Sequence, residues 1–70
     1  MKITKLSANR LNNLSYSFHK KFADTYECRK EVERLGRKGL EVRVISVKEG
    51  ITQYFSYHVY TRKKYRRSNK

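Results

Sequence analysis

The stretch LEVRVISVKEGITQYFSYHVY, residues 40–60, decides the fold because two alternating runs flank the dipeptide Glu49-Gly50. Alternation of apolar and polar residues with a period of two predicts two strands that pair as an antiparallel hairpin. A two-residue loop at this dipeptide would place Val44 opposite Phe55. One face of the hairpin is then apolar, and we expect its side chains to be buried: Val42, Val44, Phe55, Tyr57 and Val59.

A helix is expected directly before the hairpin, over about residues 24–38, in the run ADTYECRKEVERLGRKGL. Asp24 suits the N-cap position, and Glu27 three residues later completes a capping box. Gly39 suits the left-handed position that follows the C-terminus of a helix. An apolar stripe recurs at helical spacing and should face the sheet: Thr25, Cys28, Val32 and Leu35.

The run LSYSFHKKF, residues 14–22, also alternates and predicts a further strand that leads into the helix. Residues 1–13 are expected to form either a short strand or an arm. The predicted fold class is α+β, a small antiparallel sheet of three or four strands with one helix packed on one face, in β(β)αββ order. The expected divisions are the N-terminal strand or arm at 1–13, the α+β domain at 14–61 and a basic C-terminal tail at 62–70.

Charge is the strongest compositional signal. The chain has 70 residues, and its 18 Lys and Arg oppose six Asp and Glu, giving a formal net charge of +12. A field of this sign attracts polyanions, of which nucleic acid is the commonest inside a cell. The first residues lack the apolar core of a signal peptide, and no stretch is long enough to span a bilayer. We therefore expect a single soluble domain in the cytoplasm, with no membrane partner and no small-molecule substrate.

The second face of the predicted sheet is the candidate binding surface, because a single helix cannot cover both faces. Tyr54, His58 and Tyr60 are expected to point there, where rings could stack on bases and nearby cations could bind phosphates. Exposed tyrosines with no role, or a protein–protein interface, are the alternatives. The candidate nucleic-acid-binding residues are Lys21, Arg43, Tyr54, His58, Tyr60, Arg62, Lys63, Lys64, Arg66 and Arg67.

These features predict a small, basic, non-catalytic nucleic-acid-binding protein that prefers RNA or single strands to duplex DNA. Such a protein could be ribosome-associated, or could be a regulator from a phage or mobile element. The alternative is an accessory or inhibitor protein that acts by protein–protein contact on a nucleoprotein machine. The outer face of the helix could also track a phosphate backbone, although its glutamates interrupt its cations and are more typical of a solvated surface.

Catalytic and metal sites have little support in the sequence. The spacings of His19, Cys28 and His58 match no zinc-binding pattern, so no cofactor is expected. A metal-free ribonuclease is the remaining enzyme hypothesis, since the predicted register places His58 opposite Glu41 as an acid–base pair. The same two residues could equally be an ordinary cross-strand polar pair.

Overall fold

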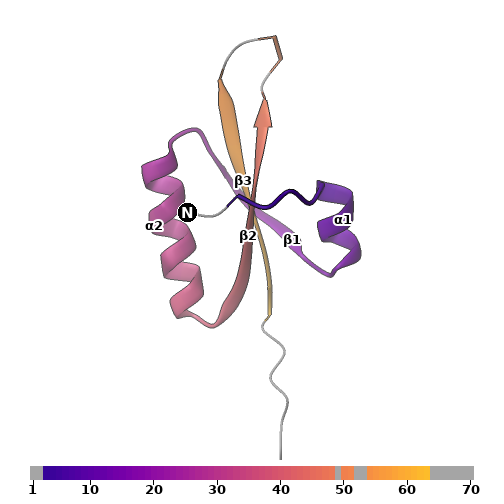
Figure 1. Cartoon of the computed structure of the whole chain (residues 1–70). Coiled ribbons are helices and arrows are strands. Elements are labelled where there is room, and N and C mark those ends of the chain that lie inside the picture. Colours follow the sequence, from indigo (N-terminus) through magenta and orange to yellow (C-terminus); the bar gives the residue numbers. More distant parts are fainter. Residues whose placement is uncertain (1–2, 49, 52–53, 64–70) are drawn as a thin grey trace, which may run out of the picture.

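A computed structural model describes residues 3–48, 50–51 and 54–63 of the chain. Along the sequence lie α1 (Ala8–Asn13), β1 (Ser17–Phe22), α2 (Thr25–Arg37), β2 (Leu40–Lys48) and β3 (Phe55–Lys63). The three strands form an antiparallel sheet in the order β1-β3-β2 (Figure 1). The α+β prediction is confirmed, because α2 packs against this sheet and the core order is βαββ. No helix among the described residues has the length and apolarity needed to cross a membrane.

The helix α2 begins at its predicted cap. The Asp24 side chain accepts a hydrogen bond at 3.0 Å from the backbone N–H of Tyr26, which satisfies one of the donors left open at a helix N-terminus. Gly39 follows the helix with a φ of 85°, in the left-handed region where glycine is favoured. Cys28 and Leu35 are buried as the stripe predicted, whereas Thr25 is exposed.

The core between α2 and the sheet is the larger apolar contact of the fold. Val44 and Val59 lie opposite each other at its centre, with 2% and 0% of their surfaces exposed. Four buried residues form this cluster, and partly buried side chains surround it: Cys28, Leu35, Val44 and Val59, with Phe22, Val32, Leu40, Val42 and Tyr57 packed against them.

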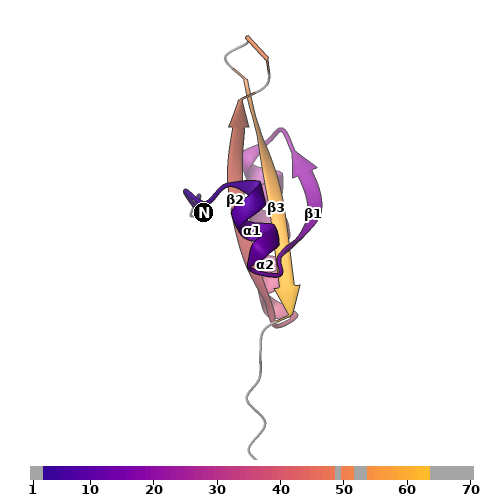
Figure 2. The same cartoon turned by 90° about the vertical axis from the view of Figure 1, so that its right-hand side faces the viewer.

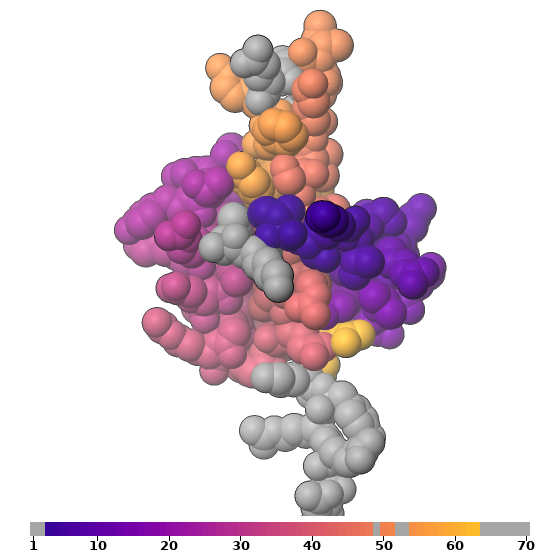
Figure 3. Space-filling view, in the orientation of Figure 1, coloured from indigo at the N-terminus to yellow at the C-terminus, as the bar shows by residue number. Residues whose placement is uncertain are grey.

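The register of the hairpin differs from the prediction by four positions. Val44 lies opposite Val59 rather than Phe55, and the strands end at Lys48 and begin again at Phe55 rather than flanking a two-residue loop. An even shift leaves every side chain on its predicted face, but it moves the end of the hairpin beyond the helix. Figures 1 and 3 show this end standing clear of both helices. Phe55 is consequently 47% exposed, and its predicted burial is wrong.

The helix α1 is the main departure from the predicted fold, because residues 8–13 were expected to belong to a strand, its turn or an arm. Ser7 is its N-cap, and the Ser7 hydroxyl accepts a hydrogen bond at 3.2 Å from the backbone N–H of Arg10. Leu11 of this helix packs on the second face of the sheet and is fully buried there. Figure 2 shows α1 lying in front of β2 and β3, so the prediction that nothing covers this face is wrong.

The ends of β1 and β3 also move relative to the predicted boundaries. The strand β1 begins at Ser17 rather than at Leu14, since Leu14 ends α1 and Ser15 turns the chain with a φ of 73°. The strand β3 continues to Lys63, past the predicted end of the domain at residue 61. Residues 64–70, the remainder of the predicted basic tail, lie outside the described residues.

Candidate nucleic-acid interface

The helix α1 divides the second face of the sheet into a covered and an open part. Beneath it, Leu11 contacts Tyr16, Ile45 and Tyr60 in a second apolar cluster. Tyr60 retains only 7% exposure there, so its ring does not offer the stacking surface that the sequence predicted. The hydroxyl of Tyr16 is buried in the same cluster without a hydrogen-bond partner among the described residues.

Two predicted phosphate ligands, Arg43 and Arg62, lie beside the ring of Tyr16 instead. Their guanidinium carbons are 5.6 Å and 4.5 Å from the ring centroid, within the range of cation–π contacts. Arg62 also forms an ion pair with Glu41 and donates to the carbonyl of Leu14. The hydrogen bond with Glu41 raises the pKa of Arg62. Arg62 therefore fastens the end of α1 to the sheet, while Arg43 is exposed.

The acid–base pair required by the ribonuclease hypothesis is contradicted by the register. Glu41 lies opposite Arg62, and His58 lies opposite Ile45. The imidazole Nε2 of His58 is instead 3.3 Å from the hydroxyl oxygen of Ser56. His58 and Glu41 therefore do not face each other across the hairpin, and the specific geometry proposed for metal-free catalysis is absent from the described residues.

The open part of the second face runs along β1. Lys21 is exposed and lies opposite the half-buried His58, so the structure brings these two predicted site residues together. Phe18 lies beside them with 54% of its surface exposed. Its ring makes edge contacts with His58 and Tyr60, each at a centroid distance of 5.6 Å. We call Phe18, Lys21 and His58 the β1 surface. Lys20 lies opposite Val59 instead, and its side chain is on the face that α2 covers.

Phe18 was missed as a site residue because it alternates with Leu14 and Tyr16, which is the pattern of the apolar side of a strand. The available signal was its position, two residues before a pair of consecutive lysines on a strand without carboxylates. The other predicted residues lie apart from the β1 surface. Tyr54 is 77% exposed at the projecting end of the hairpin, and Lys63 is exposed at the far end of β3. The predicted residues Lys64, Arg66 and Arg67 lie outside the described residues.

A side chain at a bulge in β1 forms an ion pair with a side chain of α2. The pairing of β1 with β3 shifts between Phe18 and Lys20. The intervening His19 places its Nε2 atom 2.7 Å from a carboxylate oxygen of Glu31. Arg34 binds the same carboxylate through two N–H donors, at 2.6 and 2.8 Å. Hydrogen bonds from Arg34 and then His19 hold the pKa of Glu31 at about 2, well below its usual 4.5.

Replacing Glu31 by glutamine is expected to lower the free energy of unfolding near neutral pH by on the order of 1 kcal/mol or less, since the network is partly exposed. The folded state favours the charged carboxylate, so this stabilisation is complete above about pH 4.5 and is lost as the pH falls towards about 2. Urea denaturation at several pH values in this interval should show that the difference in the free energy of unfolding between Glu31→Gln and the native chain decreases as the pH falls. Glu33→Gln, at an exposed position on the same helix, is the control, and an equal difference at every pH would contradict the expectation.

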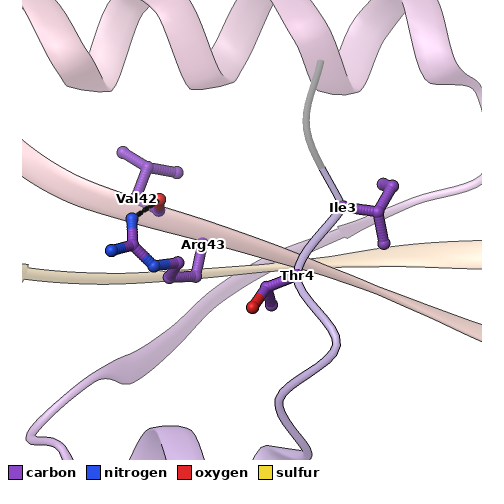
Figure 4. A pocket seen from close by; sticks show the side chains of 4 residues that line it. All are labelled: Ile3, Thr4, Val42 and Arg43. Atoms are coloured by element: carbon purple, nitrogen blue, oxygen red, sulfur yellow. Dashed lines mark hydrogen bonds between the residues drawn. The ribbon is translucent and has the colours of Figure 1, made fainter.

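A small pocket of about 300 Å³ lies at the outer edge of β2, lined by Ile3, Thr4, Val42 and Arg43 (Figure 4). It forms where the N-terminal segment crosses the strand and the backbone N–H of Thr4 donates to the carbonyl of Val44 at 2.9 Å. The described residues of its lining include one cation and no carboxylate, histidine or cysteine. Among the described residues, no group of three or more His, Cys, Asp or Glu could hold a metal ion.

Comparisons with protein-family models, with curated proteins and with solved structures found no match for this chain.

Proposed function

We propose that this protein is a small, non-catalytic nucleic-acid-binding protein that binds RNA or single strands in preference to duplex DNA. The observation that carries this proposal is the unbalanced charge of β1. Its sequence SFHKKF contains two exposed lysines and no carboxylate. The nearby carboxylate of Glu31 is already bound by Arg34 and His19. A polyanion that approaches β1 thus meets cations without a compensating acid on the strand.

The shape of the open surface supports a single strand as the ligand. Because α1 covers β2 and β3, the accessible part of this face is a strip along β1 and the adjacent side of β3 (Figure 2). Neighbouring strands are roughly 5 Å apart, so this strip is narrower than a nucleic-acid duplex. A single strand laid along it can bring a phosphate to Lys21 while its bases turn towards the protein.

The C-terminal segment after Lys63 would add to this binding through charge alone. Its sequence contains Lys64, Arg66, Arg67 and Lys70 without an acidic residue. We propose that these cations contact the phosphates of the strand that leaves the β1 surface. A cytoplasmic protein associated with the ribosome, or a regulator from a phage or mobile element, would use such an activity.

Fluorescence anisotropy with a labelled single-stranded RNA, the matching DNA strand and their duplexes tests the proposal. The affinity for single strands is expected to fall steeply with salt, with a log–log slope of about −0.7 for each phosphate contact. Duplex DNA of the same length should bind more weakly. If the chain binds none of these nucleic acids even at low salt, the proposed function is wrong.

One observation favours the alternative of a protein-binding accessory or inhibitor. The end of the hairpin carries Ile51, Tyr54 and Phe55, which are 100%, 77% and 47% exposed. Clustered apolar side chains on a projecting element are typical of protein contacts. Under this function, replacing Ile51 and Phe55 with serine would abolish binding to the nucleoprotein target and leave nucleic-acid affinity unchanged.

A further inference from the structure

Phe18 has the position and the fixed geometry of a stacking platform. Its ring is 54% exposed on the open part of the sheet, although phenylalanine is ordinarily a core residue. The rings of His58 and Tyr60 meet it at steep interplanar angles, 70° and 75°. Two edge contacts of this kind restrain an aromatic ring. The Phe18 side chain therefore loses little conformational entropy when a ligand stacks on its ring.

The charges around Phe18 identify the ligand class. Lys21 lies on the same face, opposite His58, and is exposed. A flat apolar ring next to a cation matches a ligand that has a flat apolar face next to an anion. An unpaired nucleobase on its phosphate backbone has this combination, and base stacking on aromatic rings is the usual mode for single strands.

Self-association through β1 is a poor explanation of the exposed ring. An open edge strand could pair with a second copy, but a bulge and consecutive lysines are features that oppose such pairing. The net charge of +12 adds repulsion between two copies. We infer that Phe18 stacks on an unpaired nucleobase while Lys21 binds a phosphate of the same strand. This inference rests on the proposed function and assigns it a stacking residue.

A tryptophan at position 18 provides a direct test, because the chain contains no other tryptophan. Phe18→Trp retains a flat ring, and its fluorescence should be quenched when the single-stranded RNA or DNA is added, since a stacked base quenches indole emission. Tyr26→Trp is the matched control on α2. Tyr26 is 61% exposed and has the ammonium of Lys30 4.9 Å from its ring centroid, so it shares the exposure and the neighbouring cation. Equal quenching at both positions would overturn the inference.

Affinity measurements provide the second test. Phe18→Leu keeps an apolar side chain against His58 and Tyr60 but removes the flat ring, so circular dichroism and thermal unfolding should remain near native. Its affinity for single strands is expected to fall about 5- to 150-fold, with an unchanged salt slope and an unchanged affinity for duplex. Lys21→Gln should instead make the salt slope less steep by about 0.7. Tyr26→Leu should bind as the native chain does.

The outcomes separate this inference from the proposed function. If the native chain binds no nucleic acid, the proposed function fails and the inference fails with it. If the native chain binds single strands and the folded Phe18→Leu variant binds them equally well, only the stacking role of Phe18 is overturned. A loss that is the same for single strands and duplex would also overturn it, because bases within a duplex cannot stack on Phe18.

Discussion

Replacing Leu11 with alanine is expected to lower the free energy of unfolding by about 2–5 kcal/mol, the range for leucine deletions in well-packed cores. Leu11 is fully buried and is the residue through which α1 reaches the sheet cluster of Tyr16, Ile45 and Tyr60. Its removal leaves a cavity and takes away most of the tertiary support of a helix of six residues. Because a chain of this size has little stability to lose, Leu11→Ala should be largely unfolded at 37 °C.

Leu14 provides the control for this prediction. It lies at the C-cap of the same helix and is 40% exposed. Leu14→Ala therefore removes the same atoms from a site that is already partly exposed to solvent. Urea denaturation followed by circular dichroism measures both variants. The loss for Leu14→Ala should be well below that for Leu11→Ala. Equal losses would mean that α1 does not cover the sheet as described.

Lys20 and Lys21 leave opposite faces of β1, which is an edge strand of the sheet, so a nucleic-acid backbone along this edge can contact both. Removing both lysines is expected to reduce the affinity for single-stranded nucleic acid about 25-fold at about 0.1 M salt. A slope of about −0.7 per contact corresponds to a roughly fivefold loss for each phosphate contact at this salt concentration. The double variant Lys20→Gln and Lys21→Gln should also have a salt slope less steep by about 1.4. Anisotropy titrations at several salt concentrations give both quantities. The fold should be unaffected, since both side chains are exposed.

A matched double variant in α2 and at its C-cap distinguishes a local site from a general effect of charge. Arg29 and Lys38 are exposed, and replacing both with glutamine removes the same two positive charges from another surface. If nucleic acid binds along β1, this control should lose only a small part of the affinity. If both double variants weaken binding equally, net charge alone governs the interaction and the proposed location is wrong.

Local signals were sufficient to predict α2. Asp24, the stripe at Cys28 and Leu35, and Gly39 each act within a few residues of the helix that they define. The hairpin was predicted less completely, because a period of two determines which face a side chain occupies but not which residue lies opposite it. Packing of Val44 and Val59 together beneath α2 selects the observed register, and this long-range contact is not encoded in the dipeptide Glu49-Gly50.

The candidate site was predicted in part for the same reason. Lys21 and His58 lie side by side on the expected face. The even shift in the register of β2 and β3 preserves the face of His58, whereas Lys21 reaches this face because of the bulge between Phe18 and Lys20. The burial of Tyr60 and the exposure of Phe18 depend on where α1 lies. A six-residue helix is too short to be stable alone and is formed through its contacts with the sheet, so its sequence provided only the weak signal of Ser7 as a cap.

The position of β3 has a consequence for how the chain folds. The strand β3 is central in the described sheet, and β1 and β2 each pair with it rather than with each other. It is also the last of the three strands along the sequence. On a ribosome, which makes the chain from its N-terminus, neither edge strand has its partner until residue 63 has been added. Neither helix can complete its packing before β3 is made, because the apolar cluster beneath each helix includes a residue of β3. We therefore expect folding to be a single late, cooperative event, slowed by contacts as distant in sequence as Ser17 and Thr61.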